Sequence, residues 1–204
     1  MGYELNFIKI FIIRIMKHKN NYKFSNEELS KIFFTSDTHF NHANIIKYCN
    51  RPFKDIEEMN IALIDNWNKV VPKDGTVFHL GDFAFGGFST YESIRPHLNG
   101  NIVLIAGNHD IQNLQRLYEM FEWVGEMLTI YIGKKPIILS HYPLRCYPNK
   151  YYNLFGHIHS GPNATSVDVL ENIFKPTQYD VGVDNNNYTP VSWLQIKNII
   201  NNGN

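Results

Sequence analysis

Short apolar runs alternate with longer amphipathic stretches along the first half of the chain. Three runs predict buried strands, over residues 31–35, 76–80 and 102–106. Residues 55–70 and 89–98, between them, have the apolar spacing of helices, and a further helical pattern runs from Ile111 to Phe121. Strands that alternate with helices in this order favour an α/β unit built on a parallel sheet.

The ends of these elements also carry recognisable signals. Asp55 is a suitable N-cap for the helix 55–70, and Glu58 three residues later predicts a capping box. In the second half, residues 124–132 and 136–139 predict two strands joined by a turn at Gly133-Lys134, and residues 153–155 and 179–184 predict two more. Thr189 and Pro190 are expected to begin a final helix that runs to about residue 200.

The N-terminal segment differs from the rest of the chain. Residues 7–16 are strongly apolar but carry Lys9 and Arg14, and the run is too short to span a membrane. We therefore expect a packed element or a partner-binding extension there, rather than a transmembrane or signal segment, with membrane attachment as the alternative. The polar residues that follow predict a linker, so the expected organisation is an extension and linker over residues 1–30 and one catalytic domain over residues 31–204.

Charge and cysteine content narrow the functional classes. The chain has 204 residues, with 19 basic and 19 acidic side chains, so bulk electrostatics do not indicate a polyanion-binding protein. Cys49 and Cys146 lie far apart without metal-binding spacing, and we interpret them as free thiols in a cytoplasmic protein.

Candidate chemistry gathers where the predicted strands end. Five strand ends carry carboxylate, amide or imidazole side chains: Asp37 with His39, Asp82, Asn108 with His109, His141, and His157 with His159. If these strands belong to one sheet system, their ends converge. A helix N-cap is the less favoured alternative for Asp37 taken alone. Nitrogen and oxygen donors without thiolate suit Zn, Fe, Mn or Ni. The donors exceed what one ion needs, so the sequence indicates two divalent ions, a pair that can clamp a phosphoryl group.

The same residues resemble a known family. Asp37-x-His39, Gly81-Asp82, Gly107-Asn108-His109-Asp110, His141 and Gly156-His157-x-His159 are similar, in order, to the five signature blocks of the calcineurin-like metallophosphoesterases. The amino-acid sequences of the blocks look most like those of the small, uncapped enzymes of bacteria and phages. The resemblance implies an α/β fold in which two facing mixed β-sheets are flanked by helices, with the metals at one edge.

The resemblance also implies roles for the residues. Asp37, His39 and His159 would hold the first metal, Asn108, His141 and His157 the second, and Asp82 would bridge them. His109 would not be a ligand but would protonate the leaving oxygen or stabilise charge, and a metal-bridging hydroxide would be the nucleophile. Because neutral imidazole is the ligating form, activity is expected to fall in acid.

Departures from the family pattern bear on the substrate. The protein phosphatases of this superfamily carry an Asp and an Arg after the Gly-Asp pair, whereas this chain has Phe83-Ala84-Phe85-Gly86, which argues against a phosphoprotein substrate. Asp110 is an alternative partner for His109, and Asp184 is expected to accept a hydrogen bond from a ligand imidazole. His79 is expected to pack or hydrogen-bond rather than ligate. The substrate-binding candidates are Arg145, His42 and Arg51.

The sequence therefore predicts a metal-dependent hydrolase of phosphodiesters or phosphomonoesters. A nuclease is an alternative, since Tyr142, Tyr147, Tyr151 and Tyr152 could stack bases. Only Arg145 and Lys150 accompany that loop, so nucleic acid is possible but not indicated. A metal-binding interaction protein without catalysis is a further alternative. The filled ligand positions and His109 argue against it.

Overall fold

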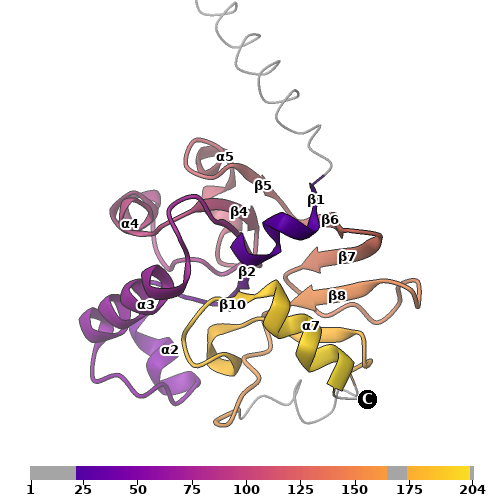
Figure 1. Ribbon diagram of the computed structural model, residues 1–204. Helices are drawn as coiled ribbons and strands as arrows, with labels where there is room; N and C mark the ends of the chain where they lie inside the picture. Colours follow the sequence, from indigo (N-terminus) through magenta and orange to yellow (C-terminus); the bar gives the residue numbers. More distant parts are fainter. Residues whose placement is uncertain (1–21, 165–173, 203–204) are drawn as a thin grey trace, which may run out of the picture.

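Two five-stranded sheets form the centre of the molecule. The computed structural model describes residues 22–164 and 174–202. The first sheet has the order β10-β2-β3-β4-β5 and the second the order β1-β6-β7-β8-β9 (Figure 1). Each is mixed, because β10–β2 and β6–β7 pair antiparallel and the other neighbours pair parallel. The predicted fold class of two mixed sheets flanked by helices is confirmed.

The bounds of the elements are as follows. The strands are β1 Lys23–Phe24, β2 Ile32–Thr35, β3 Thr76–His79, β4 Asn101–Ile105, β5 Trp123–Gly125, β6 Met127–Ile132, β7 Lys135–Ser140, β8 Tyr152–Phe155, β9 Gln178–Asp180 and β10 Val191–Ser192. The α-helices are α2 Ala43–Tyr48, α3 Ile56–Val70, α4 Phe88–Ile94, α5 Leu114–Leu117 and α7 Trp193–Asn202. Short 3₁₀ turns are η1 Asn26–Lys31, η2 Arg95–His97, η3 Ile111–Asn113 and η4 Val183–Asn185. Among the described residues, no helix is long and apolar enough to cross a membrane.

The two faces of β2 explain why its sequence is continuously apolar. Phe33 packs into a core shared with α3 and α4, whereas Ile32 and Phe34 pack into a second core between the sheets. A strand covered on both faces has no solvent side and so no alternating pattern. Figure 1 shows α2, α3 and α4 together on one side and α7, in yellow, away from them. The apolar side of α7 joins the core between the sheets.

Several predicted boundaries need correction. Residues 124–132 do not form one strand: β5 pairs with β4 in one sheet and β6 pairs with β7 in the other, so the chain changes sheets at Glu126. The last helix does not begin at Thr189-Pro190. Ser192 precedes it, with its hydroxyl donating to Gln195 Oε1 (2.7 Å) and its Oγ accepting from the Gln195 N–H (3.3 Å). The helix predicted from Ile111 is shorter than expected, and Ile111 is exposed.

The start of α3 is partly as predicted. Asp55 Oδ1 accepts from the Glu58 N–H (2.9 Å), which confirms the N-cap. The Glu58 carboxylate accepts from the Lys54 N–H (2.8 Å) and not from the Asp55 N–H, so the predicted capping box is not formed. The apolar segment 7–16 lies outside the described residues. The sheet already begins within the predicted linker, because β1 pairs parallel with β6.

Candidate metal centre

The turns that carry the candidate ligands have an unusual backbone. Asp37, His39, Asp82, His157 and His159 all have positive φ, between 48° and 72°. Side-chain-bearing residues seldom adopt this left-handed region, and each such residue costs on the order of 1 kcal/mol or more. Asp37 and His39 therefore do not lie on one side of an extended chain. A tight turn, not an extended strand, brings them together.

Neighbouring turns hold one another in place. The Asp37 N–H donates to the Gly81 carbonyl (2.9 Å) and the His39 N–H to the Asp82 carbonyl (3.0 Å). Two glycines permit this packing, because a Cβ on Gly107 would overlap Asp82 and one on Gly156 would overlap the Asp37 carboxylate. The ligand-bearing turns thus lie side by side at one edge of the two sheets.

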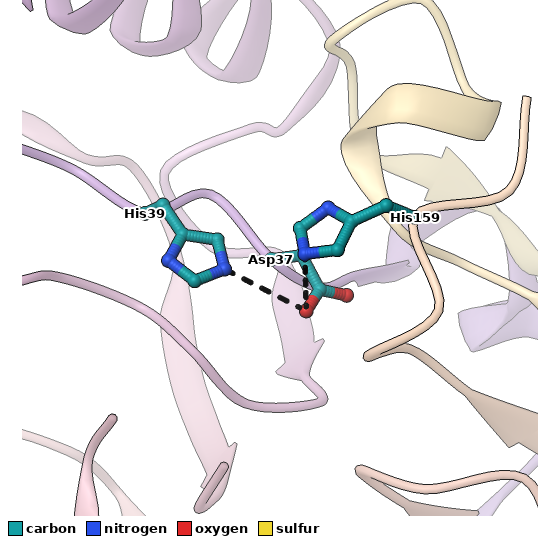
Figure 2. A group of neighbouring side chains, drawn as sticks. All are labelled: Asp37, His39 and His159. Atoms are coloured by element: carbon teal, nitrogen blue, oxygen red, sulfur yellow. Dashed lines mark ion pairs between the residues drawn. The ribbon is translucent and has the colours of Figure 1, made fainter. Parts of the chain in front are cut away.

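Asp37, His39 and His159 form the first group of donors (Figure 2). The Nε2 atoms of His39 and His159 each lie 4.0 Å from Asp37 Oδ1. Among the described residues, neither Asp37 Oδ1 nor His39 Nε2 has a hydrogen-bond partner, although both atoms are buried. Buried polar atoms are rarely left unsatisfied. Converging, unsatisfied oxygen and nitrogen atoms fit a divalent cation.

Asp82, His141 and His157 form the second group. The His141 Nδ1–H donates to the Leu80 carbonyl (2.8 Å), which leaves a lone pair on Nε2. That Nε2 lies 3.6 Å from Asp82 Oδ2 and 3.2 Å from His157 Nδ1. The Asn108 side-chain oxygen is 3.0 Å from the same nitrogen. These electron-pair donors face one another, an arrangement that suits a cation between them.

Asp82 joins the two groups. Its Oδ2 lies 3.5 Å from His39 Nε2 in the first group and 3.6 Å from His141 Nε2 in the second. Its Oδ1 accepts from the His109 N–H (2.9 Å), and this hydrogen bond holds the carboxylate near the two donor groups. The structure thus brings all seven sequence-predicted ligands to one place, with the Asp82 carboxylate near both groups.

Asp184 orients His159 from behind, as the sequence predicted. Its Oδ2 accepts from His159 Nδ1 (2.8 Å), so Nε2 points toward Asp37. Burial opposes protonation of His159, but the hydrogen bonds to Asp184 and Cys49 outweigh it and raise the pKa to about 11. Burial likewise opposes ionisation of Asp184, but His159 and Arg51 lower its pKa below the ordinary value.

The pKa values of His39 and His157 are shifted the opposite way. Burial lowers the pKa of His39 well below 6.5, and the nearby His159 and Arg51 charges add to the shift. Burial also lowers the pKa of His157, with a further contribution from His141. Neutral imidazole is the form that binds a metal, so these two side chains are ready to ligate at neutral pH.

Arg51 does not occupy the predicted substrate-binding position. Its guanidinium is buried and donates to both Asp184 oxygens, through Nε (2.9 Å) and Nη2 (2.8 Å). It also donates to the Asp37 carbonyl (2.7 Å) and the Thr38 carbonyl (3.1 Å). Arg51 therefore clamps the turn of the first block to the residue that orients His159. Nothing in the sequence distinguished this role from that of a phosphate-binding arginine.

Asp110 does not orient His109, contrary to the alternative considered above. It is fully buried and accepts from the N–H groups of Gly107 (2.9 Å), Asp82 (2.8 Å) and Phe83 (3.1 Å), and from the Tyr91 hydroxyl (2.8 Å). Burial raises its pKa to about 6 against the pull of these donors, so it is mostly ionised at neutral pH. Asp110 and Tyr91 thus position the Asp82 turn, and sequence reasoning missed Tyr91.

The other residues that the sequence singled out differ in their position relative to the centre. His109 lies at the mouth of the centre, its side chain 33% exposed and its Nε2 3.9 Å from Asp82 Oδ2. His42 is adjacent, with Nδ1 3.3 Å from His39 Nδ1. Arg145 is exposed on the loop that follows β7. His79 is buried and hydrogen-bonded to the Thr38 hydroxyl (2.9 Å), as expected for a packing residue.

The tyrosine loop does not form a common stacking face. Tyr152 is buried in the core between the sheets, and the Tyr147 hydroxyl is hydrogen-bonded to Thr177 (2.7 Å). Among the tyrosines of this loop, the Tyr142 ring contacts the centre, where it lies against His141 and His157. The four tyrosines therefore do not form one base-stacking loop, because Tyr152 is buried, whereas the exposed Tyr142 ring lies beside the metal centre.

Comparisons with known proteins agree with this arrangement. The family model described as calcineurin-like phosphoesterase matches residues 30–198. An uncharacterized protein of Methanocaldococcus jannaschii is 39% identical over 177 residues, which cover 86% of this chain and 94% of that protein. The gene 66 protein of Mycobacterium phage L5 is 33% identical over 137 residues, covering 56% and 64%. A solved structure, a protein of unknown function from Aquifex aeolicus, matches with a TM-score of 0.64 and 28% identity, covering 82% of this chain and 98% of that one.

Proposed function

Because the chain belongs to the calcineurin-like phosphoesterases, we propose that it hydrolyses phosphoesters with two divalent metal ions held at the five turns. The observation that carries the proposal is the pair of donor groups that meet at Asp82 Oδ2. Asp37, His39 and His159 would hold one ion, Asn108, His141 and His157 the other, and Asp82 would lie between them. The donor set suits Mn, Fe, Zn or Ni. When bound, such ions supply positive charge for the phosphoryl oxygens and lower the pKa of water.

His109 is the residue proposed to act on the ester itself. Its N–H is tied to Asp82 Oδ1 and its imidazole stays partly exposed beside that carboxylate, so it can reach a bound ester. There it would donate a proton to the leaving oxygen or a hydrogen bond to developing charge. Four of the proposed ligands behind it, Asp37, His39, Asp82 and His141, are buried, while the His109 imidazole is open in front, as hydrolysis of an external phosphoester requires.

The His109→Ala variant tests that role. We expect it to keep the metal content of the wild type and to lose about 10²–10⁴-fold in turnover, the usual contribution of a general acid. His97→Ala, an exposed histidine of η2, is the matched control and should retain both properties. Measured metal-to-protein ratios and steady-state rates decide it. Loss of metal, or full activity, in His109→Ala would contradict the role.

Metal loading should release protons. His159 has a pKa of about 11, so at pH 7 it carries the Nε2 proton that an ion must displace. Apparent affinity should therefore rise with pH across the neutral range, and loading should release about one proton from this residue. Calorimetric titration in buffers of different ionisation enthalpy measures the release. Loading without any proton release would contradict a His159 that is both protonated in the metal-free protein and a ligand of the ion.

The reaction class is tested with chelated protein reloaded with Mn, Fe, Zn or Ni in turn. Hydrolysis of p-nitrophenyl phosphate and bis-(p-nitrophenyl) phosphate is then followed for each form. Metal-restored turnover supports the phosphoesterase proposal, and the ratio of the two rates gives the preference for monoester or diester. Full metal occupancy without turnover of either ester would favour the non-catalytic metal-binding protein instead.

A further inference from the structure

Three exposed aromatic side chains surround the candidate metal centre. Tyr48, Phe85 and Tyr142 are 66%, 43% and 50% exposed. The Tyr48 ring lies beside His42, next to the centre, the Phe85 ring beside His42 and His109, and the Tyr142 ring beside His157. We call these three residues the aromatic rim. Single exposed apolar side chains are common on protein surfaces. Three aromatic rings that all lie against the imidazoles of one site are a less ordinary arrangement.

Phe85 is held in a fixed position on the side of the first donor group. Its ring stacks on His42, with centroids 4.1 Å apart and an angle of 9° between the planes. Its edge lies against His109, at 5.6 Å. The Phe85 N–H donates to the Phe40 carbonyl (2.9 Å), which fixes the backbone. One face of the ring is covered by His42, and the remaining exposed surface is available to a ligand.

Tyr142 is held on the side of the second donor group. Its ring centroid lies 4.4 Å from that of His157 and 4.9 Å from that of His141. Its hydroxyl is within 3.4 Å of Asn108 Oδ1, and its carbonyl accepts from the Ser140 hydroxyl (2.8 Å). Phe85 touches His109 and Tyr142 reaches Asn108, so both rings lie beside one turn. A phosphoester at that turn would lie near both rings.

The chemistry of the rim selects the kind of substrate. Arg51 is buried in hydrogen bonds to Asp184 and two carbonyls, so it offers no charge to the organic part of the ester. Flat aromatic faces bind planar groups by stacking, and every nucleobase has such a face. The chain as a whole has no net charge and so lacks the positive field that attracts a long nucleic acid.

We propose that the aromatic rim binds the base of a small nucleotide ester and so presents its phosphate to the metal centre. The inference rests on the proposed function, because the rim would otherwise have no phosphate to present. A base on the outer face of Phe85 would extend the stack that His42 begins. Tyr142 would contact the group on the other side of the phosphate.

The test compares two esters that differ only in the base. One is the methyl diester of thymidine 5′-phosphate, and the other is the same diester of the abasic deoxyribose. The metal-loaded wild type should show a kcat/KM for the base-bearing ester that is higher by about five- to a hundredfold, the range typical of one stacked base. Phe85→Leu and Tyr142→Leu should each reduce that ratio several-fold, mainly through KM. Ile61→Ala, an exposed apolar residue of α3, should leave the ratio as in the wild type.

The ratio does not depend on the fraction of folded protein, so a destabilised variant still gives an answer. Turnover of both esters at equal efficiency would overturn the rim as a base-binding site while leaving the phosphoesterase proposal intact. No turnover of either diester by the fully loaded protein would overturn this inference, and if the two p-nitrophenyl esters are not hydrolysed either, the proposed function falls with it. A long oligothymidylate preferred over the small diester would overturn the restriction to small nucleotides.

Discussion

Replacing Asp82 with asparagine is expected to abolish most turnover and to reduce metal binding from the proposed two ions per chain to one or none. The Asp82 Oδ2 atom lies within 3.6 Å of a histidine nitrogen from each donor group, so it is the one atom that both groups share. An amide removes the negative charge that holds two cations close together. Loss of a residue that only orients a ligand costs about 10–100-fold in affinity or activity, and loss of the shared ligand should exceed that.

A comparison of stability separates this effect from misfolding. Burial raises the pKa of Asp82, so ionised Asp82 is not a source of stability by itself. Asp82→Asn should therefore unfold in chelator at a temperature close to that of the wild type, but lose the stabilisation that added metal gives. Asp74→Asn, an exposed carboxylate paired with Lys31, is the control and should respond to metal like the wild type. Asp82→Asn with two bound ions and normal turnover would refute the bridging role.

Replacing Arg51 with methionine is expected to lower the free energy of unfolding by about 3–5 kcal/mol, the usual result of removing one partner of a buried ion pair. The Arg51 side chain is fully buried and that of Asp184 is 7% exposed, so solvent cannot take over the lost hydrogen bonds. The carbonyls of Asp37 and Thr38 would lose their donor as well. His159 would then be less well oriented, and metal should bind about 10–100-fold more weakly. Urea denaturation and metal titration measure the two effects.

Arg95→Met is the matched control for this substitution. Arg95 is partly buried and donates to the carbonyls of Leu98 and Gly100 (2.9 Å each), but it has no carboxylate partner among the described residues and lies outside the centre. It should lose some stability while keeping wild-type metal affinity. Arg51→Lys should fall between wild type and Arg51→Met, because one ammonium cannot replace the planar fork. A destabilisation by Arg51→Met below about 1 kcal/mol would show that the clamp is not important to the fold.

The sequence was most informative where a cluster of polar side chains directly follows a buried strand. The strands β2, β3 and β4 were predicted because both of their faces are buried, which leaves short continuous apolar runs between turn signals. The ligands were predicted because each polar cluster follows such a run. The order of the blocks then connected them to a family whose two-sheet fold the structure confirms.

What the sequence could not predict depends on contacts between distant residues. The change of sheet at Glu126 is invisible in an apolar run that continues across it, and β10 is only two residues long. The positive φ values at Asp37 and His159 are unmarked by glycine. Arg51 and Asp184 are 133 positions apart, so their pairing has no local signal. Asp110 follows His109 directly in the sequence, but this adjacency does not make it the partner of the His109 side chain. Asp110 instead orders the Asp82 turn.

A titration of chelated protein with Mn²⁺, during continuous hydrolysis of bis-(p-nitrophenyl) phosphate, tests the central claim most directly. Two donor groups that share Asp82 predict that turnover rises until two equivalents of metal per chain are bound and then levels off. Turnover that is complete at one equivalent would contradict the two-ion centre. Turnover that never appears with Mn²⁺, or with Fe²⁺, Zn²⁺ or Ni²⁺ in its place, on either this diester or p-nitrophenyl phosphate, would contradict the phosphoesterase itself.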